Sequence, residues 1–175
     1  MNLELAAMRW LWLEKKCHYI VEQRTPRHGM GQPDVIGVTK DRYLVEVEIK
    51  RSVSDFRADR AKNHRQNSSN GFHLVKYFYY LMPYKVFEKV ELEIPEWAGV
   101  LTLGEDQIMP VVKCRAPSLT GKKLSLKECA KMARAIVNHS MTTRIQLERA
   151  KQRFRDGDVE PCAWLWDQSL GSYQI

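Results

Sequence analysis

The chain has 175 residues, of which 44% are hydrophobic and 10% aromatic, and this composition excludes an intrinsically disordered or fibrous protein. The length suits one domain with a hydrophobic core, alone or with an appendage. Lys and Arg number 28 against 21 Asp and Glu, so the net charge of +7 indicates a polyanionic partner. No apolar run approaches the roughly 18 residues of a membrane span. Glu4 precedes the first apolar run, and no basic segment stands before that run, so we do not expect a signal peptide. We expect the protein to be cytoplasmic.

The four cysteines, at positions 17, 114, 129 and 162, form no C-x-x-C pair. This spacing gives no support to a zinc ribbon or a thioredoxin-like site. Reduced and mostly buried thiols are expected, and a disulfide between distant cysteines stays open.

The first half of the chain is predicted to form a helix, a strand and a hairpin, followed by a second helix. Leu3, Trp10 and Leu11 follow helical spacing within an apolar surface that extends almost all round, which is typical of a helix buried on more than one side. The predicted elements are a helix at 2–16, a strand at 18–24, a loop at 25–33, hairpin strands at 34–38 and 43–50, and a polar helix at 54–66 with Ser54 as its N-cap.

After a break at 67–71, the second half is predicted to add three strands and a long helix. Pro110 favours an edge position for the last strand. The predicted elements are strands at 72–82, 99–103 and 108–113, a short helix at 86–96 and a helix at 125–155 that ends before Gly157. This order indicates an α/β domain, a mixed sheet with helices packed against it.

Charged residues lie at the start of the first predicted hairpin strand and along one face of the second. Alternate side chains of a strand share a face, so Glu46, Glu48 and Lys50 are expected on one side and their apolar neighbours in the core. Asp34 begins the preceding strand and is expected to reach the same place. Carboxylates on adjacent strands suit Mg²⁺, and Lys50 is a point cation that can hold a water molecule. The plainer interpretation is a solvated strand face with weak cross-strand ion pairs.

At these residues the sequence resembles the PD-(D/E)xK nuclease superfamily: Pro33-Asp34 matches the PD of its motif, and Glu48-Ile49-Lys50 matches (D/E)xK. The match covers about residues 1–70. The opening is also similar to Holliday-junction resolvases of this superfamily, and EIKRSVSDFRAD at 48–59 is similar to its MmcB-like DNA repair proteins. The resemblance implies a restriction-endonuclease-like mixed central sheet flanked by helices. We expect a nuclease core at 1–115 and, beyond the reach of the resemblance, a helical C-terminal extension at 116–175 packed on it.

The resemblance also implies a function, hydrolysis of DNA phosphodiester bonds with Mg²⁺ or Mn²⁺, as an endonuclease in repair, recombination or mobile-element biology. Asp34 and Glu48 would be metal ligands with the Ile49 carbonyl, and Lys50 would orient or activate the attacking water. Glu46 is either a contact of a second ion or a solvated neighbour. The resolvases place a further glutamate on the first helix, which here is Glu4 or, as the less favoured alternative, Glu14. The ordinary role of a first-turn glutamate, favoured by the helix dipole, stays equally open for Glu4.

Basic residues cluster beside the predicted site. The candidates for contact with DNA phosphates are Arg27, His28, Arg51, Arg57, Arg60, Lys62 and Arg65. Segment 125–155 carries eight Lys and Arg against two acids and is expected either to bind DNA or to pair with a second subunit as a homodimer. Segment 86–106, with six acids and one lysine, is expected to face away from the nucleic acid. The alternatives to a DNA nuclease are a non-catalytic DNA-binding module on the same scaffold and a nuclease that acts on RNA.

Overall fold

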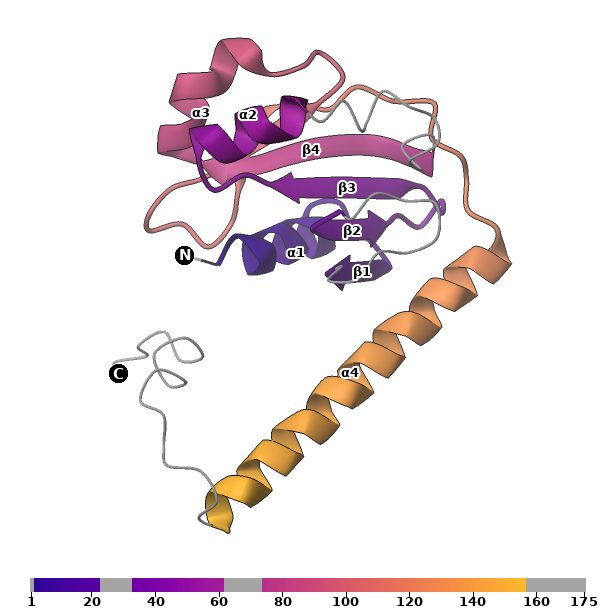
Figure 1. Ribbon diagram of the computed structural model, residues 1–175. Helices are drawn as coiled ribbons and strands as arrows, with labels where there is room; N and C mark the ends of the chain where they lie inside the picture. The colour runs from indigo at the N-terminus through magenta and orange to yellow at the C-terminus, as the bar shows by residue number, and fades with distance from the viewer. Residues whose placement is uncertain (1, 23–32, 62–73, 157–175) are drawn as a thin grey trace. The chain divides into compact units, whose positions relative to one another are not determined.

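The computed structural model describes residues 2–22, 33–61 and 74–156. Six strands within these ranges form one mixed sheet in the order in which they occur in the chain. Figure 1 shows β1, β2, β3 and β4 of this sheet side by side in that order. The helices are α1 (Leu3–Leu13), α2 (Val53–Ala61), α3 (Tyr84–Val90), the short 3₁₀ helix η3 (Glu91–Glu93) and α4 (Leu126–Arg155); the strands are β1 (Tyr19–Glu22), β2 (Val35–Val38), β3 (Leu44–Ile49), β4 (Val75–Pro83), β5 (Gly99–Leu103) and β6 (Val111–Cys114).

The strand pairs are antiparallel at both edges of the sheet and parallel in its middle. Strands β1, β2 and β3 pair antiparallel, β3, β4 and β5 run parallel, and β6 pairs antiparallel with β5 at the edge. The β2–β3 register places Val35 opposite Val47 and Val38 opposite Leu44. The hairpin turn is closed by a hydrogen bond of 3.1 Å from the Tyr43 N–H to Thr39 Oγ1, and Arg42 has a positive φ of 68°. The start of β2 therefore lies beside the end of β3.

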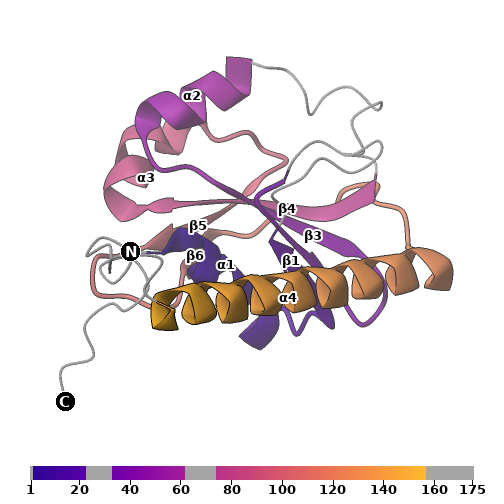
Figure 2. The ribbon, with the colours of Figure 1, turned by 60° about the horizontal axis from the view of Figure 1, so that its bottom comes forward.

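Helix α1 covers one face of the sheet. Its buried side chains, Trp10 and Leu11 among them, pack against Val45, Val47 and other strand residues of the same face. The Trp10 ring meets the Tyr79 ring edge-on, with centroids 4.8 Å apart. Figure 2 shows α1 lying across the strands on the face opposite to α2 and α3.

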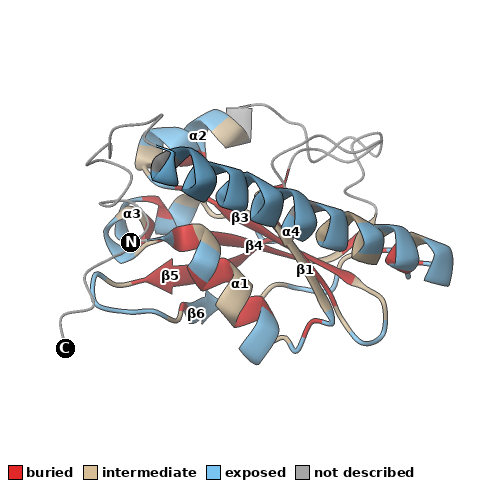
Figure 3. Cartoon of the chain, turned by 90° about the horizontal axis from the view of Figure 1, so that it is seen from below, coloured by how far each residue is buried: buried red, intermediate tan, exposed pale blue. Residues whose placement is uncertain are grey.

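Helices α2 and α3 cover the other face. Phe56 of α2 and Phe87 of α3 belong to a cluster with Phe78, Tyr80 and Met82 of β4. Because both faces are covered, all six residues of β3 are buried, as Figure 3 shows for the central strands. Glu46 and Glu48 of β3 are both buried, at 8% exposure each, so the interpretation of this strand face as a solvated one is wrong.

The predicted mixed α/β architecture and the long C-terminal helix are confirmed. The predicted cap of α2 is wrong, because the helix begins at Val53, and Ser52 Oγ accepts a hydrogen bond of 3.1 Å from the Asp55 N–H. The expected helix at 86–96 is α3 followed by the 3₁₀ turn. Helix α4 begins with a reciprocal cap, in which Ser125 Oγ accepts from the Glu128 N–H and Glu128 Oε2 accepts from the Ser125 N–H.

The chain divides into two compact units, residues 1–133 and 134–175. The first contains the sheet, its covering helices and the start of α4, where Cys129 is buried with Leu124 and three residues of β2 and β3. In the second unit, the described part is the rest of α4, with Val137, Met141 and Ile145 exposed along it. No helix in the described ranges is both long and apolar enough to cross a membrane.

Three of the four cysteines lie in the described ranges, and all three are free thiols. Cys17 and Cys129 are buried, as expected, whereas Cys114 is exposed at the edge strand. Burial raises the pKa of the Cys17 thiol to about 11. This thiol is therefore a packing group rather than a nucleophile.

Candidate active site

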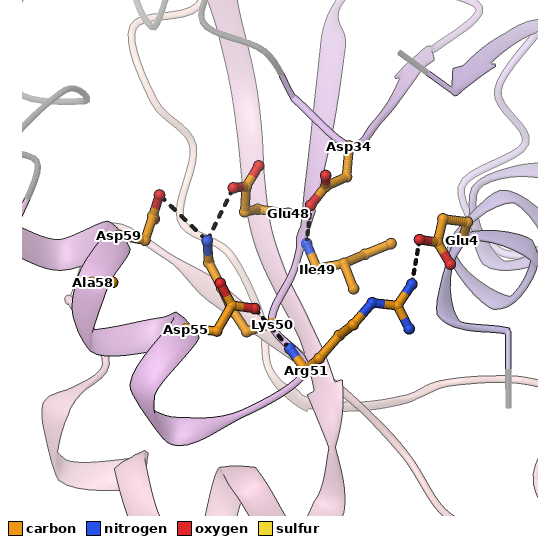
Figure 4. A pocket seen from close by; sticks show the side chains of 9 residues that line it. All are labelled: Glu4, Asp34, Glu48, Ile49, Lys50, Arg51, Asp55, Ala58 and Asp59. Carbon is orange, nitrogen blue, oxygen red and sulfur yellow. Dashed lines mark hydrogen bonds and ion pairs between the residues drawn. The ribbon is translucent and has the colours of Figure 1, made fainter. Parts of the chain in front are cut away.

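A pocket of about 280 Å³ opens at the C-terminal end of β3 (Figure 4). Four segments supply its walls: the first turn of α1, the residue before β2, the end of β3 with the residues that follow it, and α2. The lining residues are Glu4, Asp34, Glu48, Ile49, Lys50, Arg51, Asp55, Ala58 and Asp59.

The hairpin brings Asp34 and Glu48 into this pocket. Asp34 precedes Val35, which is paired with Val47, so the antiparallel register places the aspartate beside the last residues of β3. Its Oδ2 accepts a hydrogen bond of 2.7 Å from the Ile49 N–H. The convergence predicted from the alternation of the two strands is thus present.

Lys50 is held inside the pocket wall between two carboxylates. Its side chain is 4% exposed, and its Nζ lies 3.0 Å from Glu48 Oε1 and 3.3 Å from Asp59 Oδ1. Its backbone N–H donates to the Leu81 carbonyl over 2.9 Å, which extends the β3–β4 ladder to this residue. A lysine buried so deeply is costly unless opposite charges compensate it, and these two carboxylates do so.

The pKa of Asp34 is raised to about 6. Burial is the largest cause, and the negative charge of Glu48 adds to it, whereas the hydrogen bond from Ile49 and the charge of Lys50 act in the opposite direction. Glu48 is therefore close enough for its negative charge to disfavour ionisation of Asp34. A cation bound between them would relieve that repulsion.

Glu4 and Arg51 form an ion pair at the mouth of the pocket. Arg51 Nη2 lies 2.5 Å from Glu4 Oε1, and the two side chains are 57% and 30% exposed. The Arg51 backbone N–H donates to Asp55 Oδ2 over 3.0 Å. Glu4 therefore lines the same pocket as the hairpin carboxylates, as the first-helix prediction requires, but its partner is a guanidinium.

Asp55 and Asp59 are members of the site that were not predicted from the sequence. They are four positions apart on α2, so both lie on one face of that helix, and that face is turned to the pocket. Their spacing in the sequence indicates that they share a helix face, but it does not indicate that this face is turned to the pocket. With them, five carboxylates and two cations line the pocket.

The remaining predicted residues lie elsewhere. Glu46 is buried, at 8% exposure, and does not line the pocket, and neither does Glu14, which follows the last residue of α1. Arg57 points to the other side of α2, where its Nη2 lies 2.6 Å from Glu93 Oε1. Arg60 is in α2, but its side chain is outside what the structure describes. Arg27, His28, Lys62 and Arg65 also lie outside the described residues.

The donors of the pocket fit a hard divalent cation in their chemistry. Asp34 and Glu48 supply carboxylate oxygens, the ligand type that Mg²⁺ takes in proteins, and Ile49, whose carbonyl is the third predicted ligand, lines the same pocket. Each carboxylate is also turned to its own donor, Asp34 to Ile49, Glu48 to Lys50 and Glu4 to Arg51. Accordingly, no three Asp, Glu, His or Cys side chains in the described ranges already form a metal-binding group.

The comparisons with known proteins bear on the fold alone. No protein-family profile matches the sequence, and no curated protein matches it. Among solved structures, the chain is similar to the SPO1766 protein of unknown function from Silicibacter pomeroyi, with a TM-score of 0.55 and 19% sequence identity over 92% of this chain and 94% of that chain. The two chains thus share an α/β architecture over nearly their full lengths.

Proposed function

We propose that this protein is a metal-dependent DNA endonuclease with a restriction-endonuclease-like fold. The observation that carries the proposal is the meeting of Asp34, Glu48 and Lys50 in one pocket at the adjoining ends of β2 and β3. The site residues in this proposal match the two parts of the PD-(D/E)xK motif. The proposed cofactor is Mg²⁺ or Mn²⁺, the proposed partner is DNA, and the proposed location is the cytoplasm.

The charge of the pocket supports a metal-dependent reaction. Five carboxylates and two cations line it, so the pocket repels a phosphodiester, although the protein as a whole carries a net charge of +7. A divalent cation held by Asp34 and Glu48 with the Ile49 carbonyl would lower the pKa of a bound water and polarise the phosphate. A purely structural ion-pair network would not need an open pocket.

The protein side chains have separate roles in this proposal. Asp34 lines the pocket with its Oδ2 held by the Ile49 N–H, and its carboxylate would bind the metal. Lys50 is an ammonium with three N–H donors at a fixed point, and it would hold the attacking water or a non-bridging phosphate oxygen. Arg51, more than half exposed at the pocket mouth, would contact a neighbouring phosphate once it leaves Glu4.

The experiment compares the nicking of supercoiled plasmid by the wild type, Asp34→Asn and Lys50→Gln in Mg²⁺ and in Mn²⁺. Asp41→Asn is the matched control, because it removes the same charge from the exposed turn at the other end of the same hairpin. We expect each site variant to lose at least about 100-fold in rate, and the control to nick at the wild-type rate. Nicking that survives both site variants contradicts the proposal.

Two further outcomes separate the alternatives. Tight DNA binding without cleavage in any divalent metal would favour the non-catalytic binding module. Faster cleavage of RNA than of DNA of the same sequence would favour an RNA-directed nuclease. A panel of duplex, flap, four-way-junction and single-stranded DNA then identifies the preferred structure. Sedimentation of the full chain tests whether α4 pairs two copies.

A further inference from the structure

Asp59 is a pocket acid of α2 that shares the Lys50 ammonium with Glu48. Its Oδ1 lies 3.3 Å from the Nζ of Lys50, and Tyr80 Oη lies 3.5 Å from its Oδ2. Its side chain is 15% exposed, so the pair is shielded from most of the solvent. Asp59 comes from α2, whereas Lys50 and Glu48 come from the end of β3, as Figure 4 shows.

Glu48 faces two competing demands. It holds Lys50 through a bond of 3.0 Å, and in the proposed function it must also offer oxygen atoms to a divalent cation. An ammonium that loses its carboxylate inside a protein is left as an uncompensated buried charge, which is strongly unfavourable. A second carboxylate on the ammonium removes that cost, because the charge of Lys50 stays paired when Glu48 turns to the metal.

We propose that Asp59 is a positioning residue, which holds the Lys50 ammonium in place and so leaves Glu48 available to the metal ion. This inference rests on the proposed function and adds to it a residue outside the PD and E-x-K positions. Asp59 acts through Lys50 and needs no contact with metal or DNA.

Asp55 offers a matched control on the same helix. It lies one turn before Asp59, lines the same pocket and carries the same charge, but it accepts from the Arg51 backbone N–H and not from Lys50. Asp55→Asn therefore reports the general effect of removing one negative charge from the pocket. Asp59→Asn reports that effect together with any loss of the Lys50 contact.

The experiment measures Mn²⁺ affinity by calorimetry in the absence of DNA, as a double-mutant cycle. We expect Asp59→Asn to weaken Mn²⁺ binding about 10-fold in the wild-type background but only about three-fold or less in the Lys50→Met background. Asp55→Asn is expected to weaken Mn²⁺ binding about three-fold or less in both backgrounds. Circular dichroism and thermal melts check that each variant folds. Lys50→Gln replaces Lys50→Met if the latter does not fold.

Kinetics give the second readout. Asp59→Asn is expected to lower kcat at least about 10-fold and to leave KM for DNA within about three-fold, and Asp59→Glu is expected to restore most of the lost rate. Equal effects of Asp59→Asn and Asp55→Asn in every background would overturn the positioning role while the nuclease proposal stands. Absence of any Mn²⁺ binding by the wild type would overturn both.

Discussion

Asp34 Oδ2 accepts a hydrogen bond of 2.7 Å from the backbone N–H of Ile49, and this contact joins residues 15 positions apart in the chain. It lies just beyond the last paired residues of the β2–β3 hairpin, so the side chain extends the ladder where the backbone of β2 no longer does. Because Ile49 directly follows Glu48 in the chain, this hydrogen bond fixes the position of Asp34 relative to Glu48. This geometry has a cost, because it holds two carboxylates near each other in a partly buried place.

The first prediction concerns the stability cost of Asp34. Its pKa in the folded protein is raised from 3.8 to about 6, so the folded state binds the proton more tightly than the unfolded state. The penalty is therefore absent below about pH 4, grows as the pH rises from about 4 to 6, and is complete above that range. A tenfold change in proton affinity corresponds to about 1.4 kcal/mol, but the carboxyl is partly solvated, so we expect a penalty of only about 1 kcal/mol.

Asp34→Asn keeps an acceptor for the Ile49 N–H and removes the charge. It is expected to raise the free energy of unfolding at pH 7.5 by about 1 kcal/mol, to leave it unchanged at pH 4, and to abolish cleavage. Urea unfolding at the two pH values measures the first effect, with Asp41→Asn as the control. A variant that is less stable than the wild type at pH 7.5 would show that the carboxylate is a net stabilising group.

The second prediction concerns Lys50 as the counter-ion of the buried wall. Lys50→Met leaves Glu48 and Asp59 close together without the ammonium that lies between them. We expect a loss of about 3 kcal/mol in the free energy of unfolding without metal, since removal of one member of a buried ion pair exposes the cost of the other. Divalent metal should recover part of this loss.

The measurement is the rise in melting temperature on addition of Mg²⁺. It is expected to be larger for Lys50→Met than for the wild type, because the cation replaces the missing charge. Lys85→Met is the control, as its amine pairs with Glu105 on the exposed surface, where an ion pair contributes little. Equal stability of Lys50→Met and the wild type would contradict the role of Lys50 as the counter-ion of Glu48 and Asp59.

Sequence patterns predict the hairpin part of the site because its geometry is local. Alternation in β3 and an antiparallel partner 15 residues earlier are enough to bring Asp34, Glu48 and Lys50 together. The contribution of α2 is not local. Which face of α2 meets the pocket depends on how Phe56 packs edge-on against the Tyr80 ring of β4, and a run of alternating charges gives no sign of that choice.

The basic residues show the same limit of prediction from the sequence, because their roles depend on packing that is not local. Arg51 and Arg57 look equivalent in the sequence, since both belong to one basic segment. Arg51 comes to line the pocket because it closely follows the end of β3, whereas Arg57 lies on the side of α2 that faces η3 and pairs with Glu93 there. Net charge along a segment thus predicted a polyanion-binding region, but not which of its side chains line the pocket.

The third prediction separates the two roles of Glu4. In the structure Glu4 is the partner of Arg51, so Glu4→Gln is expected to free the guanidinium and to strengthen binding of duplex DNA about two- to three-fold, with Mn²⁺ affinity changed less than about three-fold. Arg51→Ala is expected to weaken DNA binding and to lower the slope of log K against log[salt] by about 1.

Fluorescence anisotropy at several salt concentrations measures the DNA affinities, and calorimetry measures the metal affinity. Glu96→Gln is a control for the removal of a glutamate from a part of the chain that does not line the pocket. If Glu4→Gln instead weakens Mn²⁺ binding more than about 10-fold, Glu4 is a metal ligand like the glutamate on the first helix of the resolvases, and the ion pair with Arg51 gives way when metal binds.

The last prediction concerns Gly121, which lies where the segment after β6 crosses the start of β4. A Cβ at this position would lie 2.4 Å from the carbonyl carbon and oxygen of Val75 and the backbone nitrogen of Lys76. These are backbone atoms of a central strand and cannot move aside. The crossing is held by hydrogen bonds from the Leu119 N–H to the Lys76 carbonyl and from the Lys76 ammonium to the Leu119 carbonyl.

Gly121→Ala should therefore push the crossing segment away from β4 and lower the free energy of unfolding by about 2 to 4 kcal/mol. Gly104→Ala is the matched control, because its Cβ would meet only the flexible end of the Gln107 side chain at 3.2 Å, and a change within about 0.5 kcal/mol is expected. Urea unfolding of the two variants tests the difference. Equal stabilities would show that the segment around Gly121 is not packed against the start of β4.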